Sequence, residues 1–141
     1  MAYGDKKDIG FAGMKADSGD SRVESYAAAG AIPFGRVATA NYAAGTVAIG
    51  GTGTGITVHT HVKPGGYKDK DNAGVMVFGN IWAAIKTGET VNAGSKVKFE
   101  AATGLIAATG ADLKGAIIVA VETLKGGSKI AQVQLNNPAT L

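Results

Sequence analysis

Short apolar runs separated by glycines constrain this chain more than any other feature of its sequence. Residues 75–78 (Val-Met-Val-Phe) and 81–85 (Ile-Trp-Ala-Ala-Ile) form two such runs, with glycines at positions 74, 79, 88 and 94 around them. β-Branched and aromatic residues favour a pleated, half-buried surface, and runs this short bounded by Gly and Asn are typical of strands. Residues 96–99 (Lys-Val-Lys-Phe) alternate strictly, which predicts one buried and one exposed face. We therefore predict two or three antiparallel strands between residues 74 and 99.

The rest of the chain continues this pattern of short strands. Residues 22–26, 46–49, 56–61 and 130–135 are further candidates, and turn signals recur about every 8–12 residues. Residues 116–121 (Ala-Ile-Ile-Val-Ala-Val) form a continuous apolar run, which predicts a strand buried on both faces. We predict an all-β fold without helices: a single jelly-roll-like sandwich or small barrel of roughly eight to ten short antiparallel strands.

The N-terminus differs from the rest of the chain in composition. Residues 1–21 are polar, glycine-rich and aperiodic, so we expect an extended N-terminal arm or loop there and a single β domain over residues 22–141. The polar start predicts no secretory signal, and no apolar run approaches the ~20 residues that span a bilayer. The absence of cysteine excludes disulfides and thiol chemistry, and fits assembly in a reducing cytoplasm.

Charge and glycine content bear on the class of partner. The net charge is only +3, with 8 basic and 7 acidic residues before residue 74 and 6 and 4 after it. This balance argues against a nucleic-acid partner. Glycine occupies 22 of the 141 positions, about twice the ~7% of an average protein, and charged residues make up 18% against roughly 25% in typical domains. Such a surface suits close contact with another protein, and an ordinary low-charge β domain remains the alternative.

His59 and His61 are the strongest candidates for chemistry. Gly53 followed by five residues and His-x-His matches the start of the metal motif of the cupin family, and two residues apart on a strand would place both imidazoles on one face. No acidic residue follows at 62–66, and the chain has no further histidine. A metal usually needs three or four ligands. Histidines lining a strand face are therefore the favoured interpretation, and a metal site is the lesser alternative.

Other patterns that suggest chemistry are incomplete. The glycine-rich residues 50–55 lack the Gly-Lys-Ser/Thr and the following helix of a phosphate-binding loop, so they predict a plain loop. Residues 69–74 lack the closing glutamate of a calcium loop. Lys86 lies near a turn without the neighbours of a lipoyl or biotinyl lysine, and no serine lies in a nucleophile-elbow pattern. The sequence predicts no catalytic site, no metal and no cofactor.

Residues 16–40 (ADSGDSRVESYAAAGAIPFGRVATA), with the Gly-x-x-Ala-Asp stretch that begins at Gly13, carry a family resemblance. This opening, the Ile-Pro-Phe-Gly segment at 32–35 and the glycine-spaced β runs that follow resemble the small capsid cement, or decoration, proteins of tailed bacteriophages. The likeness extends loosely over most of the chain. It implies a jelly-roll or barrel-like unit bound to the exterior of the virion capsid, where it bridges neighbouring capsomers of the major capsid protein and resists the pressure of packaged DNA.

The resemblance also implies partners and contact residues. We expect contacts with the major capsid protein and with neighbouring copies of the same chain, as dimers or trimers, and none with nucleic acid or membrane. An extended arm could add a strand to a capsid sheet. Our hypothesis gives the arm three apolar anchors and a rim of charges at Tyr3, Phe11 and Met14, and at Asp5, Lys6, Lys7, Asp8, Arg22 and Glu24.

Two alternatives remain open. The chain could be another β component of a phage or virion, such as the base of a head fibre or a tail part. It could instead be a small β-barrel binding module or cupin-like protein that uses His59 and His61.

Overall fold

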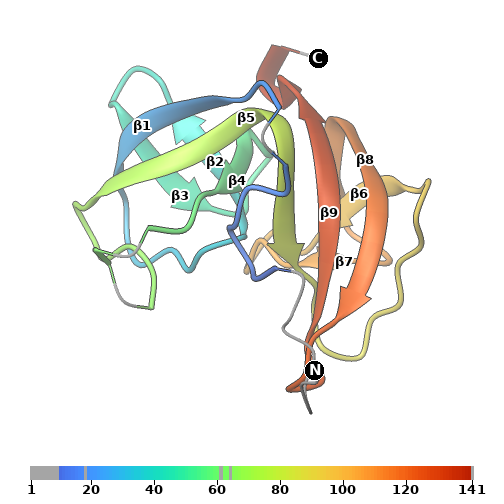
Figure 1. Cartoon of the computed structure of the whole chain (residues 1–141). Helices are drawn as coiled ribbons and strands as arrows, with labels where there is room; N and C mark the ends of the chain where they lie inside the picture. Colours follow the sequence, from blue (N-terminus) through green and yellow to red (C-terminus); the bar gives the residue numbers. More distant parts are fainter. Residues whose placement is uncertain (1–9, 18, 61, 64, 141) are drawn as a thin grey trace.

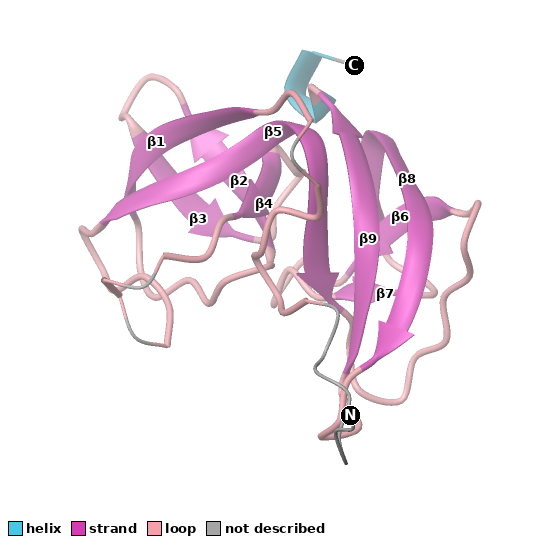
Figure 2. Cartoon of the chain, viewed as in Figure 1, coloured by secondary structure: helices cyan, strands magenta, loops and turns pink. Residues whose placement is uncertain are grey.

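The computed structural model of the chain describes residues 10–140 except 18, 61 and 64. Over these residues the fold is all-β without an α-helix, which confirms the predicted class (Figure 2). The nine strands and one short 3-10 helix are β1 (Arg22–Ala28), β2 (Val37–Asn41), β3 (Thr46–Ile49), β4 (Gly55–Thr57), β5 (Asn72–Ala84), β6 (Lys96–Phe99), β7 (Ile106–Ala107), β8 (Ala111–Thr123), β9 (Lys129–Asn136) and η1 (Pro138–Thr140).

The strands form a barrel and a curved sheet that share β5. Because β1 pairs with both β3 and β5, the order β1-β3-β2-β4-β5 closes on itself. β5 then continues past the barrel to pair with β9, and β5-β9-β8-β6-β7 forms the curved sheet. Ile106 of β7 bridges Ile85, which brings the last strand back to the end of β5. Figure 1 shows β1 to β4 on one side, β6 to β9 on the other, and β5 running through both.

Both apolar runs, 75–78 and 81–85, lie in the single 13-residue strand β5, so the two or three strands predicted between residues 74 and 99 are two, β5 and β6. Gly79 has a φ of 117°, and a Cβ there would lie 2.9 Å from Cβ of Ser21. Only glycine tolerates that backbone conformation readily. Met76 and Ile81 belong to the same core cluster, although a regular strand would place side chains five residues apart on opposite faces. The irregularity at Gly79 therefore lets one strand serve two cores.

Among the described residues, buried apolar side chains form two hydrophobic clusters. The first lies inside the barrel and includes Ala38 and Val75. The second lies between the curved sheet and the outer side of the barrel, because Val37 of β2 and Ile56 of β4 point away from the barrel interior and pack with Phe99. All three of these side chains are fully buried. The barrel and the curved sheet are thus packed into one unit.

Several predicted strands are confirmed, and three details differ. Strands occur at 22–26, 46–49, 96–99 and 130–135, as predicted. One strand pair, β1–β3, is parallel rather than antiparallel. The strand predicted at 56–61 ends at Thr57, so His59 lies in a loop. Residues 116–121 lie within the 13-residue β8, but the expectation that both faces are buried is wrong, because Ile117 and Val119 are 42% and 45% exposed.

Residues 10–16 run along the edge of β5 that β9 leaves free. Gly13 N–H donates to the carbonyl of Trp82 at 2.7 Å, Trp82 N–H donates to the carbonyl of Met14 at 3.0 Å, and Ala16 N–H donates to the carbonyl of Asn80 at 3.0 Å. Gly10 lies against the indole ring of Trp82. These contacts attach the segment to the sheet, and the division into an arm up to residue 21 and a domain from residue 22 stays a prediction.

Candidate interaction surface

A shallow groove, here called the sheet groove, crosses the outer face of the curved sheet. Its floor is formed by three strands, with Phe78 on β5 and Ile117 on β8 as its apolar side chains. Phe78 is 39% exposed and Ile117 is 42% exposed. The groove has a volume of about 580 Å³. The rest of the floor is polar, with amide side chains at Asn80, Gln134 and Asn136.

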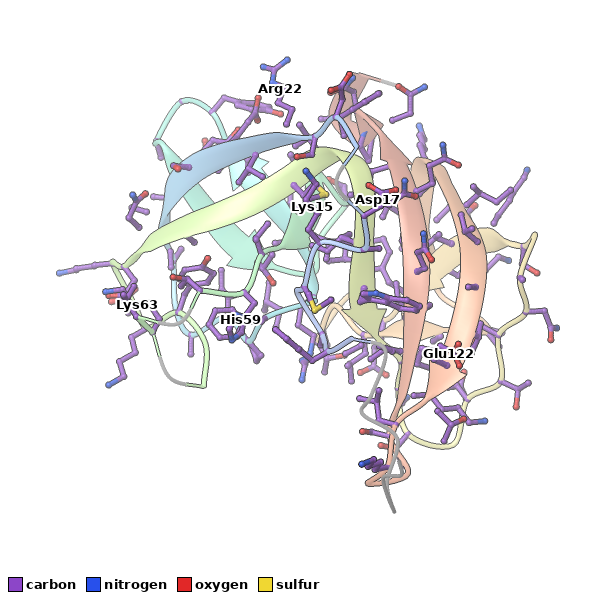
Figure 3. All side chains as sticks on the ribbon, viewed as in Figure 1. Lys15, Asp17, Arg22, His59, Lys63 and Glu122 are labelled. Carbon is purple, nitrogen blue, oxygen red and sulfur yellow. The ribbon has the colours of Figure 1, made fainter. Side chains whose placement is uncertain are left out.

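Asp17, Gly19 and Asp20 line one wall of the sheet groove, and the wall carries two carboxylates. Asp17 is held in place because its carboxylate accepts a hydrogen bond from Nδ2 of Asn80 at 2.8 Å and another from the backbone N–H of Gly19 at 3.0 Å. Asp20 is exposed and also lines the groove. Figure 3 shows Asp17 in front of the boundary between β5 and β9. The wall is therefore acidic, and it is fixed to the sheet by the same segment that runs along β5.

A second hollow, here called the barrel-end depression, adjoins the sheet groove. It is lined by Arg22, Glu24 and Tyr42 among others. Arg22 lies directly beside Phe78 in the β1–β5 ladder, so the two hollows meet at this residue pair. Tyr42 is 63% exposed and contacts Tyr26 edge-on with ring centroids 6.1 Å apart. Two aromatic rings and one ion pair make this end of the barrel a second candidate contact surface.

Hydrogen bonds order the charged groups of the barrel-end depression. Arg22 Nη2 lies 2.8 Å from Oε2 of Glu24, and the hydroxyl of Tyr26 donates to the other carboxylate oxygen of Glu24. Burial and the nearby Glu24 carboxylate raise the pKa of Tyr26 above its ordinary value. Tyr26 therefore stays protonated at neutral pH and keeps donating to Glu24.

The described residues contain no group of three or more side chains that could hold a metal ion. His59 packs between the rings of Phe11 and Phe34, with centroid distances of 4.6 and 4.7 Å. Because His59 is in a loop, the predicted placement of two imidazoles on one strand face is wrong, and His61 lies outside the described residues. Lys86 is a partly exposed lysine that pairs with Glu100 at 2.5 Å. Within the described part of the chain, no helix is long and apolar enough to cross a membrane.

Comparison with known proteins identifies the family. Residues 1–136 match the family described as structural cement protein (E217 gp24/Pam3 gp6). The chain belongs to this family of phage cement proteins. A chain of the solved capsid of Myoviridae phage XM1 has a similar fold, with a TM-score of 0.72, 19% sequence identity, and coverage of 96% of this chain and 98% of that chain. No curated protein matches significantly. This cement protein is thus a structural component of the phage capsid and not an enzyme.

The predicted contact residues that the structure describes lie on different parts of this cement protein. Phe11 packs on His59, while Arg22 and Glu24 line the barrel-end depression. Figure 3 shows His59 and Arg22 at opposite ends of the barrel. Met14 is partly buried, and its carbonyl accepts the hydrogen bond from Trp82. Tyr3, Asp5, Lys6, Lys7 and Asp8 lie outside the described residues.

Sequence reasoning missed the sheet groove of this cement protein. Its residues come from four separate parts of the chain: Asp17 with Gly19 and Asp20, then residues 78–80, 115–117 and 134–136. The one available signal was the apolar run 116–121, which is longer than a strand with a single buried face requires. Without the strand order, nothing in the sequence places that run beside Phe78 and Asp17.

Proposed function

We propose that this protein binds the outside of the capsid shell, contacts the major capsid protein, and holds neighbouring capsomers together against the pressure of packaged DNA. Membership in the structural cement family carries this proposal. The surface supports it, because the sheet groove and the barrel-end depression adjoin and both carry exposed apolar or aromatic side chains.

The build of the molecule suits a mechanical role. β5 runs through both the barrel and the curved sheet and so joins these two parts of the protein. The Lys86–Glu100 ion pair lies outside the sheet groove and the barrel-end depression. A load applied at the barrel would therefore pass through a continuous backbone to the curved sheet. Many copies on one shell can each bind with modest affinity and still act together, because the shell multiplies weak contacts.

Binding and stabilisation are tested with empty shells and with DNA-filled heads that lack the protein. The purified protein should co-sediment with empty shells to a saturable ratio. Adding it to the undecorated filled heads should raise the temperature at which they release DNA. Absence of shell binding would overturn the proposal as a whole. Binding without a change in DNA release would refute the proposed resistance to DNA pressure and leave only attachment to the shell.

The proposal includes contacts between neighbouring copies, which can be counted on the shell. Electron microscopy of saturated shells should show cement subunits grouped as dimers or trimers over the junctions between capsomers. Isolated subunits centred on single capsomers would refute both the self-contact and the bridging role.

We further propose that the N-terminal residues contribute to attachment. Residues 10–16 are hydrogen bonded to β5, so a clean test removes residues 2–9 only. The truncated protein should melt as the full chain does and bind shells more weakly, since Tyr3 and the charges at Asp5, Lys6, Lys7 and Asp8 are lost. Unchanged binding would show that the arm plays no part.

A further inference from the structure

We propose that the sheet groove receives an extended, basic segment of the major capsid protein, in which an apolar side chain packs on Phe78 and Ile117 and a lysine or arginine pairs with Asp17 and Asp20. This inference rests on the proposed function and specifies which surface meets the shell and what chemistry the partner offers.

The acidic residues of the sheet groove indicate that its partner is positively charged. Asp17 and Asp20 line the sheet groove, and no basic side chain among the described residues lines it with them. Other hollows differ, since Lys86 and Lys129 line one between the turn after β5 and the turn before β9, and Lys96 lines another beside β6. In a chain with a net charge of +3, the sheet groove is a local acidic site. Opposite charges across an interface fix the choice of partner and its register.

The apolar floor supplies the contact area. Phe78 and Ile117 lie on either side of β9, because Phe78 pairs with Asn136 and Ile117 pairs with Gln134. Both side chains keep about two fifths of their surface exposed in the free protein. Their burial under a partner side chain would be favourable through the hydrophobic effect.

The amides of the floor favour an extended partner over a helix. Asn80, Gln134 and Asn136 offer donors and acceptors along the groove. A helix satisfies its own backbone hydrogen bonds, whereas an extended segment must find partners for its N–H and C=O groups. Gly115 also lines the groove, and its missing side chain lets a foreign backbone approach closely.

The first experiment measures shell binding after a charge reversal with a matched control. Asp20→Lys reverses a charge of the acidic wall and leaves in place the hydrogen bonds that Asp17 accepts from Asn80 and Gly19. Glu122→Lys makes the same charge change on β8, and Figure 3 shows Glu122 far from Asp17 on the same sheet. We expect Asp20→Lys to weaken binding about three- to tenfold at low salt, with a smaller difference at high salt, and Glu122→Lys to bind as the natural protein does.

The second experiment identifies the occupant directly. A photoreactive benzoylphenylalanine replaces Ile117, the decorated shells are irradiated, and the cross-linked peptides are sequenced by mass spectrometry. The expected product joins position 117 to a capsid-protein segment that carries a lysine or arginine within a few residues. Cross-links to another copy of this chain, or to an acidic segment, would overturn the inference.

The outcomes separate this inference from the function on which it rests. If the natural protein and Glu122→Lys bind shells and Asp20→Lys binds equally well, the groove assignment fails and the cement function stands. If the natural protein does not bind shells, the proposed function fails, and the groove assignment fails with it.

Discussion

Substitution of Gly13 by alanine should detach residues 10–16 from β5. Gly13 has a φ of 87°, and a Cβ at this position would lie 2.8 Å from the backbone nitrogen of His59 and 2.8 Å from Cβ of Phe34. The same residue donates to the carbonyl of Trp82 and accepts from the N–H of His59 at 2.9 Å. A side chain here therefore strains the backbone and also pushes the segment away from both of its neighbours.

The cost follows from these two effects. A non-glycine residue in the left-handed region costs roughly 1–2 kcal/mol. Relief of the contacts with His59 and Phe34 sacrifices at least one backbone hydrogen bond, worth about 1 kcal/mol. The total of about 2–3 kcal/mol multiplies the population of the detached segment by roughly 30 to 150. For a chain of this length, the same loss lowers the melting temperature by about 6–10 °C if it counts fully against global stability.

Trp82 makes the assay specific, because it is the only tryptophan in the chain. Its ring is 3% exposed and lies beneath Gly10, so detachment of the segment should raise its accessibility to a fluorescence quencher. The control is Gly45→Ala, which has a φ of 70° but open space around the added Cβ. That variant tests backbone strain alone and should leave Trp82 quenching unchanged.

The outcome also bears on the sheet groove. Residues 10–16 lead directly into the acidic wall at Asp17, so Gly13→Ala should weaken shell binding as well as expose Trp82. If Gly13→Ala shows the melting temperature and the quenching of the natural protein, the segment does not depend on its contacts with β5 as argued.

Three further predictions concern the core and the titrating groups. Phe99→Ala empties a fully buried position in the shared core and should lower the free energy of unfolding by about 3–5 kcal/mol in chemical denaturation; a loss below about 1 kcal/mol would show that the core does not depend on this ring. Glu24→Gln should lower the raised pKa of Tyr26 toward its ordinary value in an ultraviolet titration, and an unchanged transition would mean that burial alone sets it. The hydrogen bond from Lys86 lowers the pKa of Glu100, so the pair stabilises the fold above the ordinary glutamate range and the contribution is lost as pH falls through the lowered pKa. Glu100→Gln should therefore show a shallower acid-side decline in melting temperature, by a small margin because the pair is exposed, and an identical decline would argue against the pair.

The elements that the sequence predicts well are those with local alternation. Residues 96–99 and 131–135 alternate between apolar and polar side chains, and both lie in strands in which these apolar side chains are buried. A two-residue period survives in any sheet that has a core on one side, whatever the strand order. The fold class follows from such local patterns, which require no knowledge of distant contacts.

The errors arise where a distant segment decides the local structure. Gly79 separates the two apolar runs in the sequence, but Ser21 packs against it and β5 continues through the irregularity. His59 was placed on a strand, but its N–H donates to Gly13 from the N-terminal segment instead of to a neighbouring strand. Neither partner lies within 40 residues in the sequence, so no local pattern could have indicated them.

The wrong prediction that both faces of residues 116–121 in β8 are buried bears most directly on function. A strand with apolar residues on both faces is expected where other parts of the protein cover both faces. In the free protein, only one face of β8 is covered. Ile117 and Val119 are exposed on the other face, in a chain that is poor in charged residues. Under the proposed function, the missing cover comes from the capsid. The sequence of β8 would then describe the strand in its assembled state, and the difference from the free structure marks where the partner binds.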